Sequence, residues 1–421
     1  MRLLAILAAL AFTLQIQAQP RIRPQTFSLP NGLRVILLED HDRPLVRARL
    51  HLSLEREAGV ARPGLAPLAM RVLGQSDAGA FRLGDFEQLL AGAGIELAPN
   101  LRADGLSWSL LARSRDQDLA LGLLADRAFR SIIDPTTLEA ERLACWRETE
   151  RLEASPQSKL RQTLESDWTL QAPTLESLTA VTYEDLLAFF ARVLRPDRAV
   201  LVLQGDLGQE QAKRLVLLSF GTWTVRPEPA APTTTIATPA PVTVPGPAAG
   251  APAEARPSQA PATGAILRAL AVASEPADLS PEARALLALL LPGDPVLFPA
   301  QLRLEGMDLV ATLEAEAPGT AAVEASLRER LQALTQRGFT ETDLRQARSA
   351  WSAGRALVGL HPWALVDEAV AEARERAVSP ARMEALTIEA LNEALRRWLD
   401  PSRLRTGVLA DPQAVRASAR P

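Results

Sequence analysis

One short stretch decides how the rest of the chain is interpreted: Gly64-Leu65-Ala66-Pro67-Leu68-Ala69-Met70-Arg71-Val72-Leu73. We interpret it as the core of a helix that extends from Arg62 to Gly74. Positions 67 and 71 of such a helix lie on one face, four residues apart, with position 70 beside the second. Pro67, Met70 and Arg71 are unsuited to holding a divalent metal ion there. Proline and methionine offer neither a nitrogen ligand nor a base, and a guanidinium is always cationic.

The stretch resembles the G-L-x-H-x-x-E-H-x-L helix of the pitrilysin/insulinase family of zinc metallopeptidases, the inverted zincins. In that family two histidines hold Zn²⁺ and the glutamate beside the second is the general base. The alignment places Pro67 and Arg71 at the histidines and Met70 at the glutamate. The resemblance therefore implies a degenerate, catalytically inactive member, and we expect zinc to be absent from this chain.

A second helix supports this alignment. The family's third ligand is a glutamate that stands 76 residues beyond the second histidine, and here 76 residues separate Arg71 from Glu148, with Glu141 seven residues before it. Glu148 would be the surviving ligand-like position, although a helix-surface acid is an equally good interpretation because a single carboxylate cannot hold zinc. If Arg71 stands at the lost histidine, we expect it to form an ion pair with Glu148 where the metal would lie.

The composition and the N-terminal residues limit which compartment and which partners are expected for this protein. A formal net charge of −4 without a clustered arginine stripe disfavours nucleic acid as a partner. Met1-Arg2, the apolar run Leu3–Leu14 and the small residue Ala18 predict a secretory signal peptide. The run is shorter than the ~20 residues of a membrane span, so we expect an exported protein, periplasmic or secreted, with no transmembrane span in the mature chain. Cys145 is the only cysteine and is expected to be a small buried residue.

Local patterns predict the elements of the first half. Asn31-Gly32, between alternating apolar and polar residues, indicates a hairpin within Thr26–Leu38. Further strands are expected at 44–54, 95–111 and 198–205, and helices at 83–90, at 117–129, from 134 onward and at 182–190. The three histidines, His41, His51 and His361, have no spacing typical of a ligand pair, so each is interpreted as satisfied or solvent-facing.

The chain repeats itself. Thr182–Arg198 aligns without gaps with Thr387–Arg403 at an offset of 205, and further upstream Arg142 matches Arg348 at an offset of 206. Matches over this many positions indicate two copies of one α/β unit. Duplicated α/β halves are also what the pitrilysin/insulinase family contains, so the resemblance extends over nearly the whole mature chain.

The fold class we expect is α+β, with two homologous α/β halves that each pack helices on an antiparallel-rich sheet, and the resemblance implies a clamshell arrangement. Between the halves, a stretch rich in Pro, Ala and Thr predicts an extended linker. The expected organisation is a signal peptide at 1–19, an N-terminal peptidase-like domain with a degenerate metal site at 20–225, the linker at 226–263, a C-terminal peptidase-like domain at 264–415 and a tail at 416–421.

The second half also departs from the family. Active assemblies use an Arg and a Tyr, in a pattern like L-R-x-x-x-G-L-x-Y, to hold the peptide against the zinc site. The matching run is one residue short: Leu302-Arg303-Leu304-Glu305-Gly306-Met307-Asp308-Leu309. Arg303 is therefore a candidate substrate-binding residue, with a surface arginine as the alternative. The tyrosine is missing, because Leu309 stands in its place and Tyr183 is the only tyrosine of the chain.

Three functions remain open, because a fold does not fix a function. The resemblance favours a non-catalytic partner subunit that forms a heterodimer with a zinc-bearing homologue and supplies part of a substrate chamber, although the missing tyrosine counts against it. A stand-alone cell-envelope protein that binds peptides or unfolded polypeptides, or serves as a scaffold, is the second. An enzyme with a relocated site is the third, and no Ser/His/Asp or Cys/His set supports it.

Overall fold

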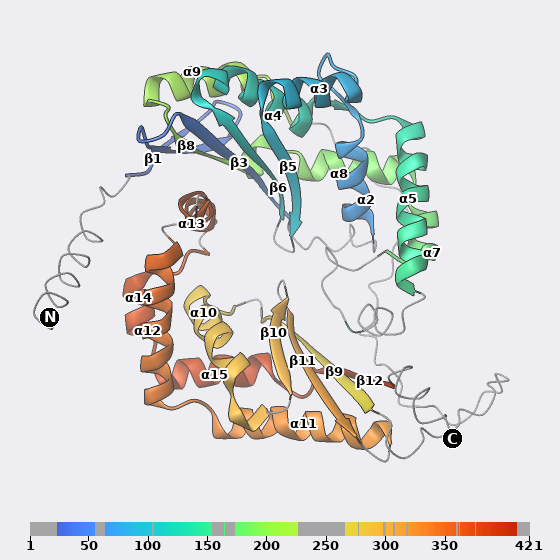
Figure 1. Ribbon diagram of the computed structural model, residues 1–421, viewed down its shortest axis with the longest axis vertical. Helices are drawn as coiled ribbons and strands as arrows, with labels where there is room; N and C mark the ends of the chain where they lie inside the picture. Colours follow the sequence, from blue (N-terminus) through green and yellow to red (C-terminus); the bar gives the residue numbers. More distant parts are fainter. Residues whose placement is uncertain are drawn as a thin grey trace, which may run out of the picture.

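The computed structural model describes residues 23–54, 64–102, 105–153, 164, 173–225, 266–276, 278–297, 300–305, 308–316, 319–358, 361, 363–374 and 376–410. The predicted signal peptide, the linker 226–263 and the tail 416–421 lie outside these residues. The described residues form two lobes, one above the other in Figure 1, and each lobe has a β-sheet with helices on its outer side. The predicted α+β class with two halves is confirmed.

The first lobe contains a six-stranded sheet in the order β1-β2-β8-β3-β6-β5. Its strands are β1 (Gln25–Ser28), β2 (Arg34–Glu39), β3 (Leu45–Ser53), β5 (Glu96–Arg102), β6 (Gly105–Arg113) and β8 (Ala199–Gly205). β2 and β8 are parallel, and the other neighbouring strands are antiparallel. The hairpin predicted around Asn31-Gly32 is confirmed as β1–β2, in which Gln25 lies opposite Leu37. The short strands β4 (Asp77–Ala78) and β7 (Ser131–Ile132) pair separately.

The helices of this lobe are α2 (Leu65–Gly74), α3 (Leu83–Ala93), α4 (Gln117–Phe129), α5 (Pro135–Glu153), α7 (Leu175–Ala180), α8 (Tyr183–Val193) and α9 (Gln209–Phe220). They share one apolar core with the outer face of the sheet, to which β3 contributes the fully buried side chains Val46, Ala48, Leu50 and Leu52. The helix predicted from Leu83, with its end at Gly92 and Gly94, is α3. It continues through Gly92 and stops before Gly94, which adopts the left-handed conformation that glycine tolerates.

The second lobe is a smaller copy of the first. Its strands are β9 (Ile266–Ser274), β10 (Gln301–Glu305), β11 (Asp308–Glu316) and β12 (Arg405–Ala410), and its helices are α10 (Pro281–Leu290), α11 (Thr320–Arg337), α12 (Glu341–Val358), α13 (Ala364–Ala373), α14 (Pro380–Ala385) and α15 (Ile388–Trp398). The antiparallel sheet has the order β10-β11-β9-β12, which matches β5-β6-β3-β8 of the first sheet. Within the described ranges this lobe has no counterpart of β1 and β2.

Equivalent hydrogen bonds confirm the internal duplication. Thr182 and Thr387, 205 residues apart, each cap a helix by accepting a hydrogen bond from a backbone amide in its first turn, Thr182 for α8 and Thr387 for α15. Arg142 of α5 and Arg348 of α12 each donate to backbone carbonyls in and around the short helix that follows, α7 and α14 respectively. The matched residues therefore make equivalent hydrogen bonds in the two copies.

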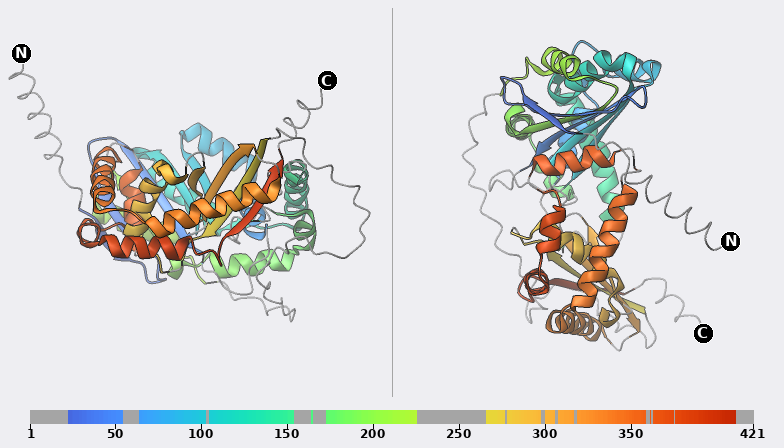
Figure 2. Two further views of the ribbon diagram at one scale, coloured as in Figure 1. Left: turned by 90° about the horizontal axis from the view of Figure 1, so that it is seen from below. Right: turned by 90° about the vertical axis from the view of Figure 1, so that its left-hand side faces the viewer.

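Helix α13 belongs to the second half of the sequence and packs on the first sheet. Figures 1 and 2 show it between the two lobes. Its buried residues form one apolar cluster with residues of β2 and β8: Val366, Ala369 and Val370 against Ile36, Leu38, Val200 and Val202. Arg49 of β3 forms an ion pair with Asp367 and lies over the Trp363 ring, 5.1 Å from its centroid. The inner face of the first sheet is thus partly covered by the other half of the chain.

A reciprocal contact joins the first half to the second sheet. Leu164 is 1% exposed and shares an apolar cluster with Val272 of β9 and Val310 of β11. Leu164 precedes Val370 by 206 residues, the offset of the duplication. The two inter-lobe contacts are therefore equivalent, and each half covers part of the other half's sheet.

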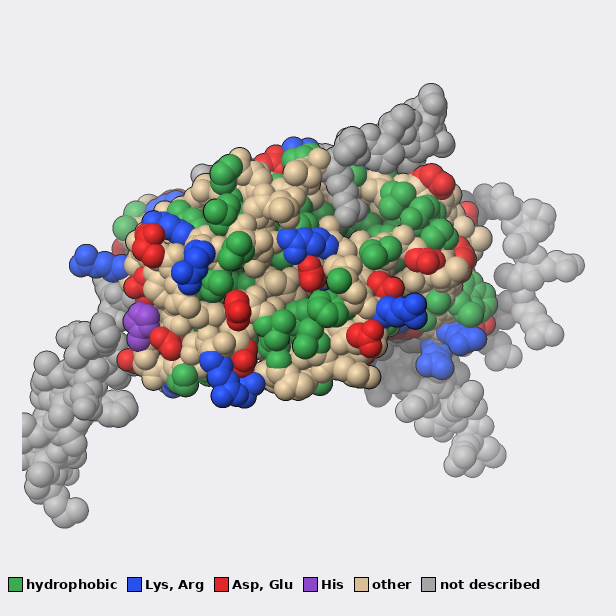
Figure 3. Space-filling model, turned by 90° about the horizontal axis from the view of Figure 1, so that it is seen from above, with side chains coloured by type: hydrophobic (Ala, Val, Ile, Leu, Met, Phe, Trp, Pro, Cys, Tyr) green, Lys and Arg blue, Asp and Glu red, His purple; other side chains and the backbone are tan. Residues whose placement is uncertain are grey.

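The surface is mixed in charge. Figure 3 looks onto the helices that cover the first sheet, where Arg, Asp and Glu side chains are interspersed with small apolar groups. Such a face lacks the continuous basic surface that nucleic acid requires. Within the described part of the chain, no helix combines the length and the apolar character that crossing a membrane needs.

Gly205, at the end of β8, lies where a side chain would be poorly tolerated. Its φ is +133°, and an added Cβ would lie 2.0 Å from the carbonyl oxygen of Leu45. We expect Gly205→Ala to lower the free energy of unfolding by at least about 2 kcal/mol, because backbone strain adds to the clash. At Gly92, inside α3, an added Cβ meets nothing within 4 Å, so Gly92→Ala should not lower the free energy of unfolding. Chemical denaturation measures both, and equal losses would contradict this account.

Candidate functional site

The stretch that opened the sequence analysis is α2. Gly64 precedes it in the left-handed conformation, with φ of 81°, and the apolar residues that follow turn the buried face of the helix into the core of the first lobe. Arg71 lies on the other side, where its side chain is 41% exposed. Arg127 of α4 secures the end of the helix by donating to the backbone carbonyls of Leu73 and Ser76, at 2.9 and 2.7 Å.

Helix α5 brings two carboxylates to Arg71. The guanidinium Nε lies 3.0 Å from Oε2 of Glu141, and Nη1 lies 3.1 Å from Oε2 of Glu148. The ion pair predicted between Arg71 and Glu148 is therefore present. The second partner, Glu141, was not anticipated, although its spacing of seven residues from Glu148 places both on one face of a helix. That spacing was the signal that could have revealed it.

Electrostatics at this group favour the charged arginine. Burial lowers the pKa of Arg71, but the hydrogen bond to Glu141 and the charges of Glu141 and Glu148 outweigh it and raise the pKa. Cys145 lies between the two glutamates along α5 and is 5% exposed, as expected for a small buried residue. Burial raises the pKa of its thiol, against the opposing charge of Arg71, so the thiolate that nucleophilic chemistry needs is disfavoured.

The group does not fit the zinc ion that the resemblance implies for active relatives. A cationic side chain lies between the two carboxylates, so a metal ion there would meet a like charge at close range. Among the residues that the structure describes, no group of three or more His, Cys, Asp or Glu side chains is placed to hold a metal. We assign no metal-dependent step to this site.

A shallow cleft of about 260 Å³ adjoins the ion pairs. One wall is α2 with Glu141, and the other is the edge strand β5, including Pro99, Asn100 and Leu101. An edge strand offers backbone groups with which a further strand can pair. Pro99, which pairs with Trp108 inside the sheet, has no N–H, and proline is tolerated in a sheet where its nitrogen faces solvent. A peptide strand that paired along β5 would therefore have one backbone N–H donor fewer to bind at Pro99.

The other candidate residues lie apart from this cleft. Arg303 is in β10 of the second lobe, opposite Val310, and Leu309, which the predicted alignment places at the family's tyrosine, is 1% exposed in β11. His41 Nδ1 lies 2.8 Å from Oδ1 of Asp206, and His361 Nδ1 accepts a hydrogen bond from a backbone amide. His51 is buried in β3. The histidines therefore take part in separate local structures.

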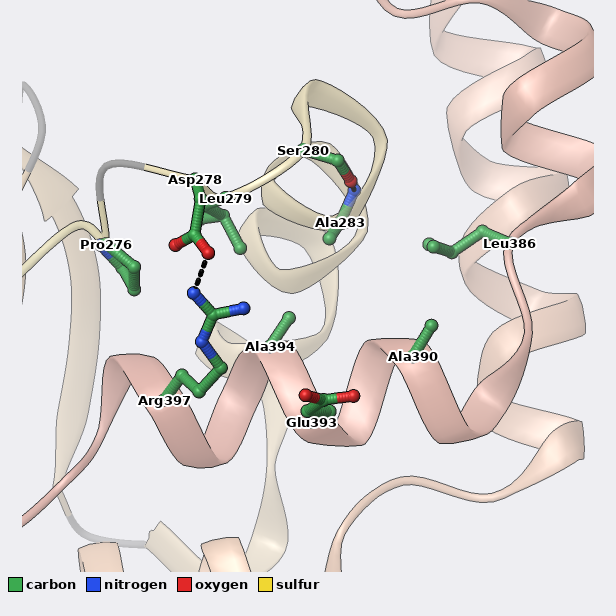
Figure 4. A pocket seen from close by; sticks show the side chains of 10 residues that line it. All are labelled: Pro276, Asp278, Leu279, Ser280, Ala283, Leu386, Ala390, Glu393, Ala394 and Arg397. Carbon is green, nitrogen blue, oxygen red and sulfur yellow. Dashed lines mark hydrogen bonds and ion pairs between the residues drawn. The ribbon is translucent and has the colours of Figure 1, made fainter.

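A second hollow lies at the start of α10 and holds charges that already neutralise one another. Figure 4 shows Asp278 and Arg397 pointing toward each other across its mouth, with Glu393 on the same helix as Arg397. A hydrogen bond between the two lowers the pKa of Asp278 and raises that of Arg397. The hollow has a volume of about 290 Å³, and its two facing charges, Asp278 and Arg397, are bound to each other.

Comparison with known proteins identifies the fold. A family model described as the peptidase M16 inactive domain matches residues 180–260. The fold of the chain is that of M16-like peptidases, as the similar solved structures show. Its structure is similar to that of a protease from Helicobacter pylori, with a TM-score of 0.68, 14% identity and coverage of 92% of this chain and 99% of that one. A structure described as a peptidase M16 inactive domain from Pseudomonas fluorescens is similar with a TM-score of 0.66 and 16% identity. The match covers 92% of this chain and 98% of that one.

A longer relative shows how such a unit can be part of a larger protein. The periplasmic protease PqqL from Escherichia coli is similar to this chain with a TM-score of 0.65 and 16% identity, over 92% of this chain but only 45% of PqqL. This chain thus spans about half the length of that protease. No curated protein sequence matches it.

We call Arg71, Glu141 and Glu148 the Arg71 cluster. Because the cluster is partly exposed, we expect its ion pairs to contribute little to the stability of the fold. The side chains of Arg71 and Glu148 are 41% and 62% exposed, so solvent screens their attraction, whereas the side chain of Glu141 is 15% exposed. We expect Arg71→Ala to lower the free energy of unfolding by about 1 kcal/mol. Arg127→Ala, in which two backbone acceptors lose a buried donor, should cost about 2–3 kcal/mol. Urea unfolding of both variants checks this, and an equal loss would mean that the Arg71 cluster is effectively buried.

Proposed function

We propose that this homologue is the non-catalytic subunit of a two-chain peptidase, paired with a zinc-bearing homologue whose substrate chamber it helps to form. The observation that carries the proposal is the Arg71 cluster. In a two-lobed M16-like fold, the position that aligns with the second zinc-ligating histidine is an arginine bound to Glu141 and Glu148. The two-lobed fold is present, but ion pairs occupy the position of the metal site. We therefore propose a role that depends on the two-lobed fold and not on a bound zinc ion.

The length of this chain relative to PqqL supports a second subunit as its partner. This chain matches less than half of that single-chain protease, and a structure described as the first half of PqqL gives a TM-score of 0.61 with coverage of 95% of its length. A protease of that length has room for two such units. A chain that supplies one unit without a metal site would need a second chain to supply the catalytic unit.

The cleft beside β5 fits a supporting role. Its edge strand is blunted by Pro99, so a polypeptide would be held there less firmly than along an uninterrupted edge. We therefore place the main contacts of the substrate, a peptide or an unfolded polypeptide, on the catalytic partner. Arg303 of β10 is the residue of this chain that we propose for substrate contact. The predicted leader and the periplasmic description of PqqL support a location outside the cytoplasm.

A pull-down with a quantitative readout tests the proposal. The tagged mature chain is recovered from envelope extract of its own organism, captured proteins are identified by mass spectrometry, and zinc is assayed in each separated chain. We expect a stoichiometric homologue with an intact H-x-x-E-H, zinc in that homologue only, and peptidase activity that rises when the two purified chains are mixed. Recovery of this chain alone, without zinc, would overturn the proposal in favour of a stand-alone binding or scaffold protein.

A further inference from the structure

An apolar hollow of about 830 Å³ lies in the second lobe between α10, α12 and α13. Its walls consist largely of small side chains with two larger apolar ones: Ala285, Ala288, Leu289, Ala350, Trp351 and Gly354. Its volume lies within the range of about 300–1,000 Å³ that is typical of small-ligand sites. It is remote from the Arg71 cluster in the first lobe.

The duplication explains why the hollow exists. With the offset of 206 that relates α5 to α12, Glu148 corresponds to Gly354 and Glu141 corresponds to Ala347. The second copy thus has a glycine and an alanine where the first copy has two carboxylates. An added Cβ on Gly354 would meet nothing within 4 Å, so the space beside it is open. Beside this hollow the second copy therefore lacks the carboxylate that Glu148 contributes in the first copy.

Four charged side chains line the hollow: Arg355, Asp367, Glu368 and Arg376. The first three form ion pairs with protein groups. Arg355 of α12 forms an ion pair with Glu368 of α13 and lies over the Trp351 ring, 5.5 Å from its centroid. Asp367, the other acid of α13 at this rim, is bound by Arg49 of the first lobe. A charged ligand would have to displace one of these partners and would lose hydration on entry. An uncharged apolar ligand would gain the burial of its surface without that loss.

We infer that this hollow is a binding site for an uncharged, apolar small molecule that carries a ring or a branched chain. Such a ligand would pack its faces on the alanine-rich helices, beside the indole of Trp351. Because α13 also packs on the first sheet, the ligand would contact the helix that joins the lobes. The site is independent of the metal-like position and of any partner subunit.

Two dyes that differ in charge test the ligand class on the full mature chain. N-phenylnaphthylamine is neutral, and anilinonaphthalenesulfonate has the same rings with an added sulfonate. We expect saturable fluorescence enhancement with the neutral dye and at least a tenfold weaker affinity for the anionic one. Absence of saturable binding by the neutral dye, or tighter binding of the anionic dye, would overturn the inference.

Matched glycine variants test the location. Gly354→Leu fills the hollow and should weaken the binding of N-phenylnaphthylamine at least tenfold. Gly122→Leu, in α4 of the first lobe, is the control, since an added Cβ there also meets nothing within 4 Å, and its affinity should stay within twofold of wild type. If Gly354→Leu does not fold, Ala288→Met on the facing helix α10 replaces it with the same expected loss. Unchanged binding in a folded hollow-filling variant would show that the dye binds elsewhere and would refute the assignment.

Discussion

The triple variant Pro67→His, Met70→Glu, Arg71→His is expected to bind one zinc ion, which the wild-type chain should not. Positions 67 and 71 are one turn apart on α2, and Arg71 already contacts both Glu141 and Glu148 of α5. Two imidazoles with a carboxylate from a second helix form a zinc-binding set, and the open fourth position takes water. At a free zinc concentration of 100 times the dissociation constant, binding should stabilise the fold by about 2.7 kcal/mol. Metal analysis after dialysis, with a zinc-dependent shift in the thermal midpoint, measures both effects.

The controls for this variant separate a rebuilt site from adventitious binding. Adding Glu148→Gln to the triple variant should abolish stoichiometric zinc, whereas Met70→Glu alone should bind none, because it adds no ligand pair. We expect zinc binding to return without peptidase activity, since Leu309 still occupies the position of the family's tyrosine. A triple variant that folds but takes up no zinc would show that α2 and α5 are not spaced as a metal site, and the alignment of Arg71 with the second histidine would fail.

The second large effect concerns the contact between the lobes. Val366 of α13 is 0% exposed in the apolar cluster that this helix forms with β2 and β8. Val366→Asp would place an uncompensated carboxylate there, and we expect the docking of α13 to be weakened by about 3 kcal/mol or more. Hydrogen exchange of the amides of residues 364–373 is the direct measurement, and protection should fall by at least about 100-fold.

An exposed position on the same helix gives the matched control. Glu372 lies on the solvent side of α13, so Glu372→Ala removes a charge without touching the apolar cluster. In Glu372→Ala the amides of residues 364–373 should keep the wild-type protection from hydrogen exchange. If Val366→Asp left the exchange of α13 unchanged as well, the helix would not depend on the first sheet for its order, and the account of the two lobes as mutually covered would be wrong.

Sequence reasoning succeeded where local patterns carry the information. The hairpin at Asn31-Gly32 and the helices at 117–129 and 182–190 follow from turn chemistry and periodicity, which act over a few residues. The duplication was also readable, because both copies keep the residues that make the same hydrogen bonds. The pairing of Arg71 with Glu148 could be predicted only because a resemblance supplied the relative placement of two helices.

What the sequence by itself determined is most of the elements of the first half, the repeat, and the presence of residues unsuited to a metal ion at positions 67, 70 and 71. Only the tertiary structure decided how those elements meet. The docking of α13 on the first sheet and the hollow beside Gly354 both depend on contacts between segments far apart in the chain. Such contacts are set by which apolar faces are left over once each half has folded, and the helical period of α13 is the same whether it covers its own sheet or the other one. The blunted edge at Pro99 also acquired meaning only when β5 proved to be the last strand of its sheet.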